Sequence, residues 1–382
     1  FGRYAPAVGF FSFPESSPFN TLGRDVDAFH RFVGHGNRVD SVDVDEITIS
    51  TGIEGKLNDN IGYNAYVRYF DYSGAELGNT YVQASVLEAE VLAGNYDVFN
   101  PLSQDPVHLG AVERSGVQLS RDLKTQDFDV GLTFNGSAFE MSGGSIGWAV
   151  GAEAADQEYT DIYDEFREAL DVLGSAGNSA QGDRDRWAIF GEVRLPITDS
   201  FEVNLAGRYD DYSDFGAEFS PQVNARWGVN DNLTLRASWG EGFKAPNLID
   251  LYQELAESFD DLADQNRCSA QGLAAGNCPT FQVQNFSGGN SSLVAEESES
   301  FNLGVVFQIG GFAASMDYYD VEITNGVTSL SLDQVNQREA DGTLPAGVIV
   351  NRGPSVGSIP GAIIDVINPL TNGASVETAG FD

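Results

Sequence analysis

A two-residue alternation of apolar and polar side chains limits the possible folds of this chain more than any other property. Between residues 201 and 209, odd positions such as Leu205 are apolar and even positions such as Glu202 are polar or small. Successive side chains of a β-strand point to opposite faces of a sheet, so a period of two is typical of a strand with one apolar and one polar face. The same alternation recurs in segments 217–229 and 233–239.

Weaker copies of the pattern bring the number of predicted strands to ten. These copies cover residues 47–53, 63–71, 128–139, 146–154, 187–195, 301–309 and 312–318.

The connections between the predicted strands fall into a short and a long class that alternate along the chain. The short connections have turn-like residues and cover 56–60, 141–144, 196–200, 230–232 and 310–311. The long, acidic connections cover 73–125, 159–183, 241–299 and 324 onward, with 213–216 as a short exception. In an up-and-down meander alternate connections lie at the same end of the sheet, so one end carries hairpin turns and the other carries large loops.

Two β architectures compete for this pattern. A soluble β-sandwich also alternates, but its strands are typically ~5 to 6 residues long, whereas several segments here reach the ~9 to 11 residues that a tilted strand needs to cross a bilayer. Short turns at one end and long loops at the other are typical of outer-membrane barrels. We therefore predict an all-β, antiparallel up-and-down transmembrane β-barrel with short periplasmic turns and long extracellular loops. In this barrel the apolar positions of each strand face lipid and the alternating polar positions, here called the polar parity, face the lumen.

The composition excludes two other classes of protein. The chain has 57 Asp and Glu against 20 Lys and Arg, a formal net charge of -37 at pH 7, which excludes a basic nucleic-acid-binding protein. Its apolar runs are short and interrupted by glycine, so no segment approaches the ~20 residues of a membrane-spanning helix.

The cysteine and histidine residues suggest a structural crosslink and no metal centre. Cys268 and Cys278 lie close together in one polar segment, which favours a loop-closing disulfide and an oxidising compartment over two free thiols. His30, His35 and His108 have none of the spacings of a metal site. No cofactor motif and no catalytic set of residues can be assembled, so we do not expect an enzyme.

One stretch goes beyond generic alternation. Residues 236–252, RASWGEGFKAPNLIDLY, closely resemble the R-A-S-x-x-x-G-F-[RK]-A-P-x-L-x-x-L-[YF] segment of TonB-dependent outer-membrane receptors. The matching positions singled out here are Arg236, Gly242, Phe243, Lys244, Ala245, Pro246, Leu248, Leu251 and Tyr252.

Two downstream stretches extend the resemblance. Residues 290–304 are similar to the family's N-P-x-L-x-P-E-x-S-x-x-x-x-L-G stretch, although Ser291 and Ala295 stand where the family usually has Pro. Residues 317–323 resemble its D-Y-Y-x-I-x-I strand.

Several charged side chains occupy the polar parity beside Arg236. In a barrel they face the lumen, where they either pair across strands and with a plug or remain solvated. The residues concerned are Arg194, Arg208, Arg226, Glu192, Glu202 and Glu218.

The resemblance implies a barrel of about 22 strands closed around an N-terminal plug, so ten strands form only part of one. Residues 1–45 are expected to be loop-like or irregular, 46–325 to form barrel strands with a large loop at 241–299, and 326–382 to hold a loop and the start of a further strand. No plug is recognised, and the chain begins at Phe1 without a Met or a leader. We expect a fragment truncated at both ends.

The resemblance also implies a function. It predicts a receptor in the outer membrane of a Gram-negative bacterium that imports a scarce nutrient with energy from TonB. The receptor is expected to be a monomer and to contact lipid, lipopolysaccharide and its own plug. The ligand stays open among an iron–siderophore complex, cobalamin, a glycan fragment and a peptide, and no ligand-binding residue is assigned. A passive porin-like or structural outer-membrane barrel and a secreted glycan-binding β-sandwich remain the alternatives.

Overall fold

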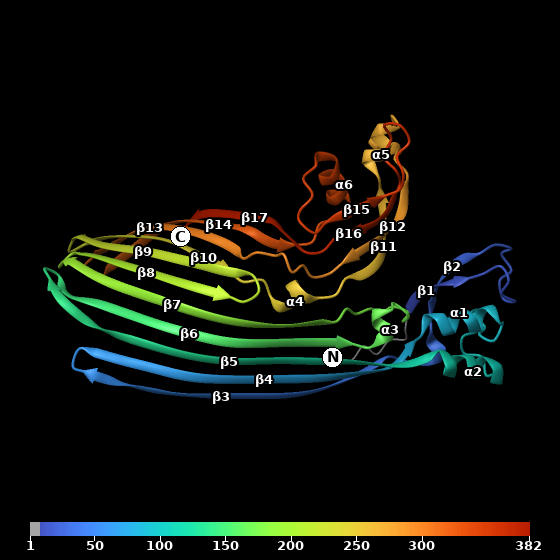
Figure 1. Cartoon of the computed structure of the whole chain (residues 1–382), viewed down its shortest axis with the longest axis horizontal. Coiled ribbons are helices and arrows are strands. Elements are labelled where there is room, and N and C mark those ends of the chain that lie inside the picture. Colours follow the sequence, from blue (N-terminus) through green and yellow to red (C-terminus); the bar gives the residue numbers. More distant parts are fainter. Residues whose placement is uncertain (1–7) are drawn as a thin grey trace.

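A single large antiparallel sheet dominates the computed structural model, which describes residues 8–382 (Figure 1). Its eleven strands follow the order β17-β14-β13-β10-β9-β8-β7-β6-β5-β4-β3. Their bounds are β3 Val39–Asn58, β4 Ile61–Val82, β5 Gly116–Met141, β6 Gly144–Tyr163, β7 Ala180–Thr198, β8 Phe201–Tyr212, β9 Gly216–Asn230, β10 Leu233–Lys244, β13 Glu296–Ile309, β14 Phe312–Thr328 and β17 Thr371–Phe381. Within the described residues the sheet is open, with β3 and β17 at its edges.

The predicted up-and-down arrangement is confirmed. Each of the five hairpins at one end has a two-residue turn, and the long connections gather at the opposite end, on the right of Figure 1. The β13–β14 turn consists of Gly310 and Gly311, and Gly310 adopts φ 56°, a left-handed conformation that glycine reaches without steric cost.

The two faces of the sheet differ as the alternation predicts. Val193, Leu205 and Val223 are neighbours in register across three strands on one face, and they remain 36%, 43% and 39% exposed. Burying such a side chain fully is worth about 1.5–3 kcal/mol, so this face is suited to an apolar surrounding.

The opposite face carries paired charges. Asp129 on β5 is 4% exposed. Its carboxylate forms salt bridges with the guanidinium groups of Arg68 on β4, at 2.6 Å, and Arg186 on β7, at 3.2 Å. Arg186 reaches across β6 because the intervening residue in register is Ala155, which is small.

A first small module, here called the histidine module, lies at the loop end of the sheet. It consists of β1 (Val8–Phe13), β2 (Val26–Arg31), the 3₁₀ turn η1 (Val33–His35), α1 (Ala84–Leu92) and α2 (Pro106–Ser115). Helix α2 begins where the Asp105 carboxylate accepts the Val107 N–H and Pro106 occupies the first turn. The module has its own apolar core, which includes Phe32, Leu87 and Tyr96.

A second small module, here called the two-loop module, combines the β10–β13 and β14–β17 connections. The first loop supplies β11 (Ala256–Ala263), α5 (Gln265–Ala270), the 3₁₀ turn η2 (Ala275–Asn277) and β12 (Thr280–Ser287); the second supplies α6 (Leu332–Asp341), β15 (Ile349–Arg352) and β16 (Ile363–Ile367). The loops share one sheet, because β12 pairs in parallel with β16. A common core that includes Leu262, Val335 and Val366 joins them.

The strands extend beyond the alternating segments that predict them. The strands β3 to β7 contain 19 to 26 residues, and β3 begins at Val39, so the segment 1–45 expected to be irregular contains part of a strand and the β1–β2 hairpin. The loop expected at 241–299 is shortened, since β10 runs to Lys244 and β13 begins at Glu296. These strand ends lack a consistent apolar parity, so backbone pairing continues where the side-chain signal has stopped.

The eleventh strand, β17, includes the segment near the C-terminus in which the sequence predicts the start of a further strand. Among the described helices, none is long and apolar enough to cross a membrane.

Candidate functional site at the loop end of the sheet

The segment that resembles the family signature forms a strand and then a strap. Residues 236–244 belong to β10, and residues 245–254, here called the strap, contain α4 (Leu248–Tyr252). Helix α4 is capped because the Asp250 carboxylate accepts both the backbone N–H of Asn247, at 3.2 Å, and its side-chain amide, at 2.8 Å.

The strap reaches a strand that is not a neighbour of β10. Gln253 forms an isolated antiparallel bridge with Ala180 at the start of β7, and the Glu254 N–H donates to the Ser179 carbonyl at 2.9 Å. A methyl group on Gly182 would come within 2.2 Å of the Tyr252 ring, so glycine allows this close packing. Since β8 and β9 lie between β7 and β10, the strap passes the short β8–β9 turn at 213–215.

Arg184 on β7 holds the strap to the wall. Its side chain is 6% exposed, its Nε donates to Asp214 Oδ2 at 2.7 Å, and its Nη2 donates to the Pro246 carbonyl at 2.7 Å. The guanidinium also lies 5.3 Å from the Tyr212 ring centre and 5.6 Å from that of Phe215. Charge-assisted hydrogen bonds and cation–π contacts thus join β7, the β8–β9 turn and the strap at one buried side chain.

Other signature residues complete the same junction. The Phe243 ring lies 6.0 Å from Tyr212 and 6.4 Å from Phe215. Leu251 is buried at 4% exposure, and Lys244 Nζ lies 3.1 Å from Glu296 Oε2. Gly242 accepts a hydrogen bond from Ser298 Oγ at its carbonyl.

The remaining signature residues lie on β10 and in the strap. Arg236 sits on the charged face and donates from Nε to Asp317 Oδ1 at 2.8 Å. Ala245 and Leu248 lie in the strap, partly exposed. Sequence reasoning missed Arg184 and Asp214, because nothing local distinguishes them from other polar residues near strand ends and in turns.

The charges predicted to face the lumen do share one face of the sheet, and several pair across strands. Arg194 lies 3.1 Å from Glu202, and Glu192 accepts from Asn204 at 2.7 Å. Arg208 lies 2.8 Å from both Glu153 and Asp210. In register, Arg226 lies beside Glu202 and Arg236, and Glu218 lies opposite Asp210.

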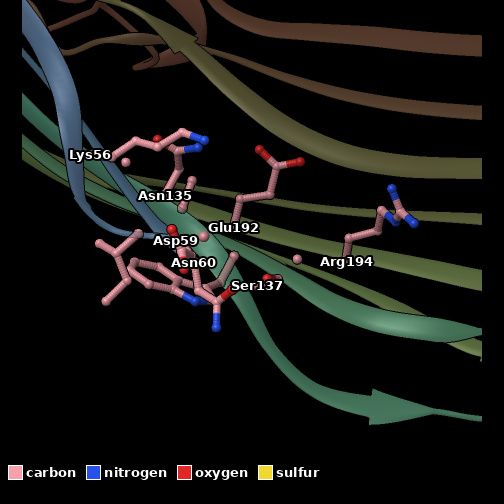
Figure 2. Close-up of a pocket in the computed structure, with 13 residues that line it drawn as sticks. Lys56, Asp59, Asn60, Asn135, Ser137, Glu192 and Arg194 are labelled. Atoms are coloured by element: carbon pink, nitrogen blue, oxygen red, sulfur yellow. The ribbon is translucent and has the colours of Figure 1, made fainter.

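A cavity opens on this face near the hairpin turns. It measures about 500 Å³ and is lined by Lys56, Asn135, Glu192 and Arg194, among others. Figure 2 shows these four side chains projecting to the same side of the sheet from β3, β5 and β7. The arrangement presents charges of both signs and amide groups, which suits a polar protein or ligand surface.

His30 and His35 meet the distant His108 around Tyr96 in the histidine module. His30 Nε2 lies 3.3 Å from the Tyr96 hydroxyl, the His108 ring stacks on Tyr96 at 4.8 Å between centres, and His35 Nε2 lies 2.8 Å from Ser115 Oγ. Burial, reinforced by repulsion from His108 and His30, lowers the pKa of His35 to about 4. The described residues contain no cluster of three or more His, Cys, Asp or Glu arranged to hold a metal ion.

The two-loop module holds the cysteines and a buried ion network. Cys268 and Cys278 form a disulfide. Arg352 donates to Asp264 Oδ2 at 2.6 Å and to Glu339 Oε2 at 2.7 Å, and Asp264 is 1% exposed. Burial opposes ionisation of Asp264, but hydrogen bonds from Arg352, the Arg267 backbone and Asn336 outweigh it and hold its pKa below the usual value.

Comparison with known proteins gives matches that include siderophore receptors. The chain is 30% identical over 198 residues to the probable TonB-dependent siderophore receptor PirA of Acinetobacter baumannii, covering 49% of this chain and 24% of that protein. It is 32% identical over 150 residues to the ferric enterobactin receptor PirA of Pseudomonas aeruginosa, covering 39% and 18% respectively. The chain therefore matches about a quarter or less of the length of these curated relatives.

Among solved structures, the siderophore receptor PirA from Acinetobacter baumannii aligns with 94% of this chain and 61% of its own, at 16% identity and a TM-score of 0.44. A family model described as "TonB dependent receptor-like, beta-barrel" matches residues 2–382. Since that match spans nearly the whole chain, the chain belongs to the TonB-dependent receptor β-barrel family.

Proposed function

We propose that this chain forms part of the wall and outer loops of a receptor that imports an iron–siderophore complex using energy from TonB. The family match over residues 2–382 carries the proposal. The siderophore as ligand class is taken from the names of the relatives, two of which are a siderophore receptor and a ferric enterobactin receptor.

The two faces of the sheet support a place in the outer membrane of a Gram-negative bacterium. In the proposed setting the apolar face around Leu205 contacts lipid and the outer part of the wall contacts lipopolysaccharide. The charged face around Asp129 and Arg194 lines the lumen and contacts a plug, through which TonB acts. We infer that the receptor is a monomer and that it works by binding and transport, not by catalysis.

The test uses the full-length gene expressed in a Gram-negative strain that lacks its own ferric enterobactin receptors. Uptake of radioactive iron as ferric enterobactin is measured in cells with and without TonB, together with binding to purified receptor. We expect saturable uptake that disappears without TonB while binding persists. Uptake that is unchanged without TonB, combined with ion conductance in planar bilayers, would instead identify a passive pore.

A further inference from the structure

We propose that Arg184 is a positioning residue that clamps the strap, residues 245–254, as a fixed rim at the mouth of the ligand path. The inference deepens the proposed function, on which its ligand-binding part rests. Arg184 and Asp214 lie outside the signature segment, and the inference assigns to them the role of holding that segment in place.

The first step concerns the Pro246 carbonyl. Pro246 is buried, and the hydrogen bond from Arg184 Nη2 at 2.7 Å satisfies its carbonyl oxygen. A buried acceptor that loses its partner is costly. Without the guanidinium, the Pro246 carbonyl would lack a hydrogen-bond partner, so we expect the strap to move and expose this carbonyl to water.

The second step concerns the charge that holds Arg184 itself. Asp214 is 3% exposed on its side chain and lies 2.6 Å from Arg184 Nη2. A pair of this kind orients the guanidinium rather than adding much net stability, because desolvation offsets most of the attraction. The fork shape of arginine allows one group to bind Asp214 and Pro246 together, which a lysine ammonium does less well.

The third step concerns what the strap encloses. Between the strap and the charged face lies a cavity of about 360 Å³, lined by Asp127, Gln157 and Tyr159 from the wall and by Asn247 and Leu248 from the strap. Arg184 belongs to the same lining. A movement of the strap changes the shape of this cavity, so the affinity for a ligand bound here depends on the contacts of Arg184.

The strap can be linked to the wall independently of Arg184. Ala180 and Gln253 are paired as an antiparallel bridge, and paired residues of this kind lie about 4.5–5.5 Å apart between Cα atoms. This spacing falls in the range that a disulfide accepts. The double substitution Ala180→Cys and Gln253→Cys thus provides a covalent replacement for the clamp.

The experiment compares full-length receptors with ferric enterobactin as the probe. Arg184→Met with Asp214→Asn removes both buried charges, which leaves no unpaired ion. Arg114→Met is the control, because Arg114 also pairs with a carboxylate, Glu90 at 2.5 Å, but belongs to helix α2 and lies outside the strap and the lining of its cavity. Folding is checked by heat-modifiable gel migration, and strap mobility by a spin label at residue 249.

We expect the Arg184/Asp214 variant to fold, to show a mobile strap and to bind the probe about tenfold more weakly. The control is expected to stay within about twofold of wild type. Adding the engineered disulfide between positions 180 and 253 should restore the affinity, which a general loss of stability would not explain.

Three results would overturn the inference. The strap could stay rigid in the folded variant, the affinity could stay unchanged, or the crosslink could abolish uptake in the wild-type background, which would make the strap a moving lid. If wild-type receptor fails to bind ferric enterobactin, the ligand of the proposed function is wrong, but strap mobility still decides the clamp. Should the double variant fail to fold, Arg184→Lys is measured in the same way.

Discussion

Three histidine side chains show how burial sets the chemistry of single residues. His108 Nδ1 accepts the Asp97 N–H at 3.0 Å, and its Nε2 faces the Pro101 carbonyl at 3.2 Å, which suits a neutral ring protonated on Nε2. Ser115 Oγ donates to the Ala111 carbonyl, so its contact with His35 suits a neutral ring that donates. The pKa values of His30 and His35 are both lowered, chiefly by burial.

The lowered pKa of His35 predicts that acid loosens the histidine module. The folded value of about 4 lies below the ~6.5 of an unfolded histidine, so its stabilising contribution is present above pH 6.5 and is lost as the pH falls toward 4. The loss amounts to roughly 2–3 kcal/mol. Hydrogen exchange of residues 84–115 at pH 7.5 and pH 4.5 measures it.

Two comparisons make the measurement specific. His35→Gln should reduce the acid sensitivity of residues 84–115, and the two-loop module should change less over the same pH range because its described segments contain no histidine. Equal acid sensitivity in wild type and His35→Gln would contradict the assignment to this ring.

At the scale of elements, two long loops behave as one folded unit. The parallel pairing of β12 with β16 joins them through the backbone, and Arg352 joins β15 to Asp264 before α5 and to Glu339 on α6. The disulfide between Cys268 and Cys278 closes the segment that begins with α5. These links predict that local unfolding of one loop opens the other.

Arg352→Met tests the coupling. It leaves Asp264, 1% exposed, without its charge partner, which typically costs about 3–5 kcal/mol. We expect limited proteolysis to cut both loops faster, at 256–287 and at 332–367, while the sheet stays resistant. Arg338→Met, a charge loss on α6 that leaves the Arg352 pairs in place, is the control; cleavage confined to one loop would argue against a single unit.

At the scale of the whole molecule, the sheet separates an apolar from a charged face. Leu205 and Ala206 are consecutive on β8 but lie on opposite faces, beside Val193 and Glu192 respectively. Within a barrel wall, Leu205 would face the hydrocarbon of the bilayer and Ala206 would face the aqueous lumen.

This difference predicts opposite outcomes for one substitution at adjacent positions. Leu205→Arg should destabilise the membrane-inserted receptor by about 2–4 kcal/mol if it lies near the bilayer midplane. Ala206→Arg, which places its charge next to Glu192, should cost far less. Urea unfolding of the receptor in lipid vesicles measures both, and equal costs would contradict the assignment of the faces.

Ten strands of the large sheet, their two faces and the classes of connection follow from the sequence alone. These properties are local, because the pleat forces a period of two on any strand with one apolar face, and a two-residue turn is readable from residues such as Gly310 and Gly311. The resemblance carried by residues 236–252 identified the family for the same reason, since its residues are contiguous.

The ends of the strands and the meetings of distant residues depend on the tertiary structure. The strand ends lack a regular alternation: on β3, Val39, Val42 and Val44 fall on both faces, so backbone pairing extends β3 to Val39 without a consistent side-chain signal. Arg184 and Pro246 are 62 positions apart, and His35 and Ser115 are 80 apart. Such contacts depend on the path of the intervening chain, which composition and periodicity leave open, and so the clamp, the histidine cluster and the joined loops emerge only from the fold.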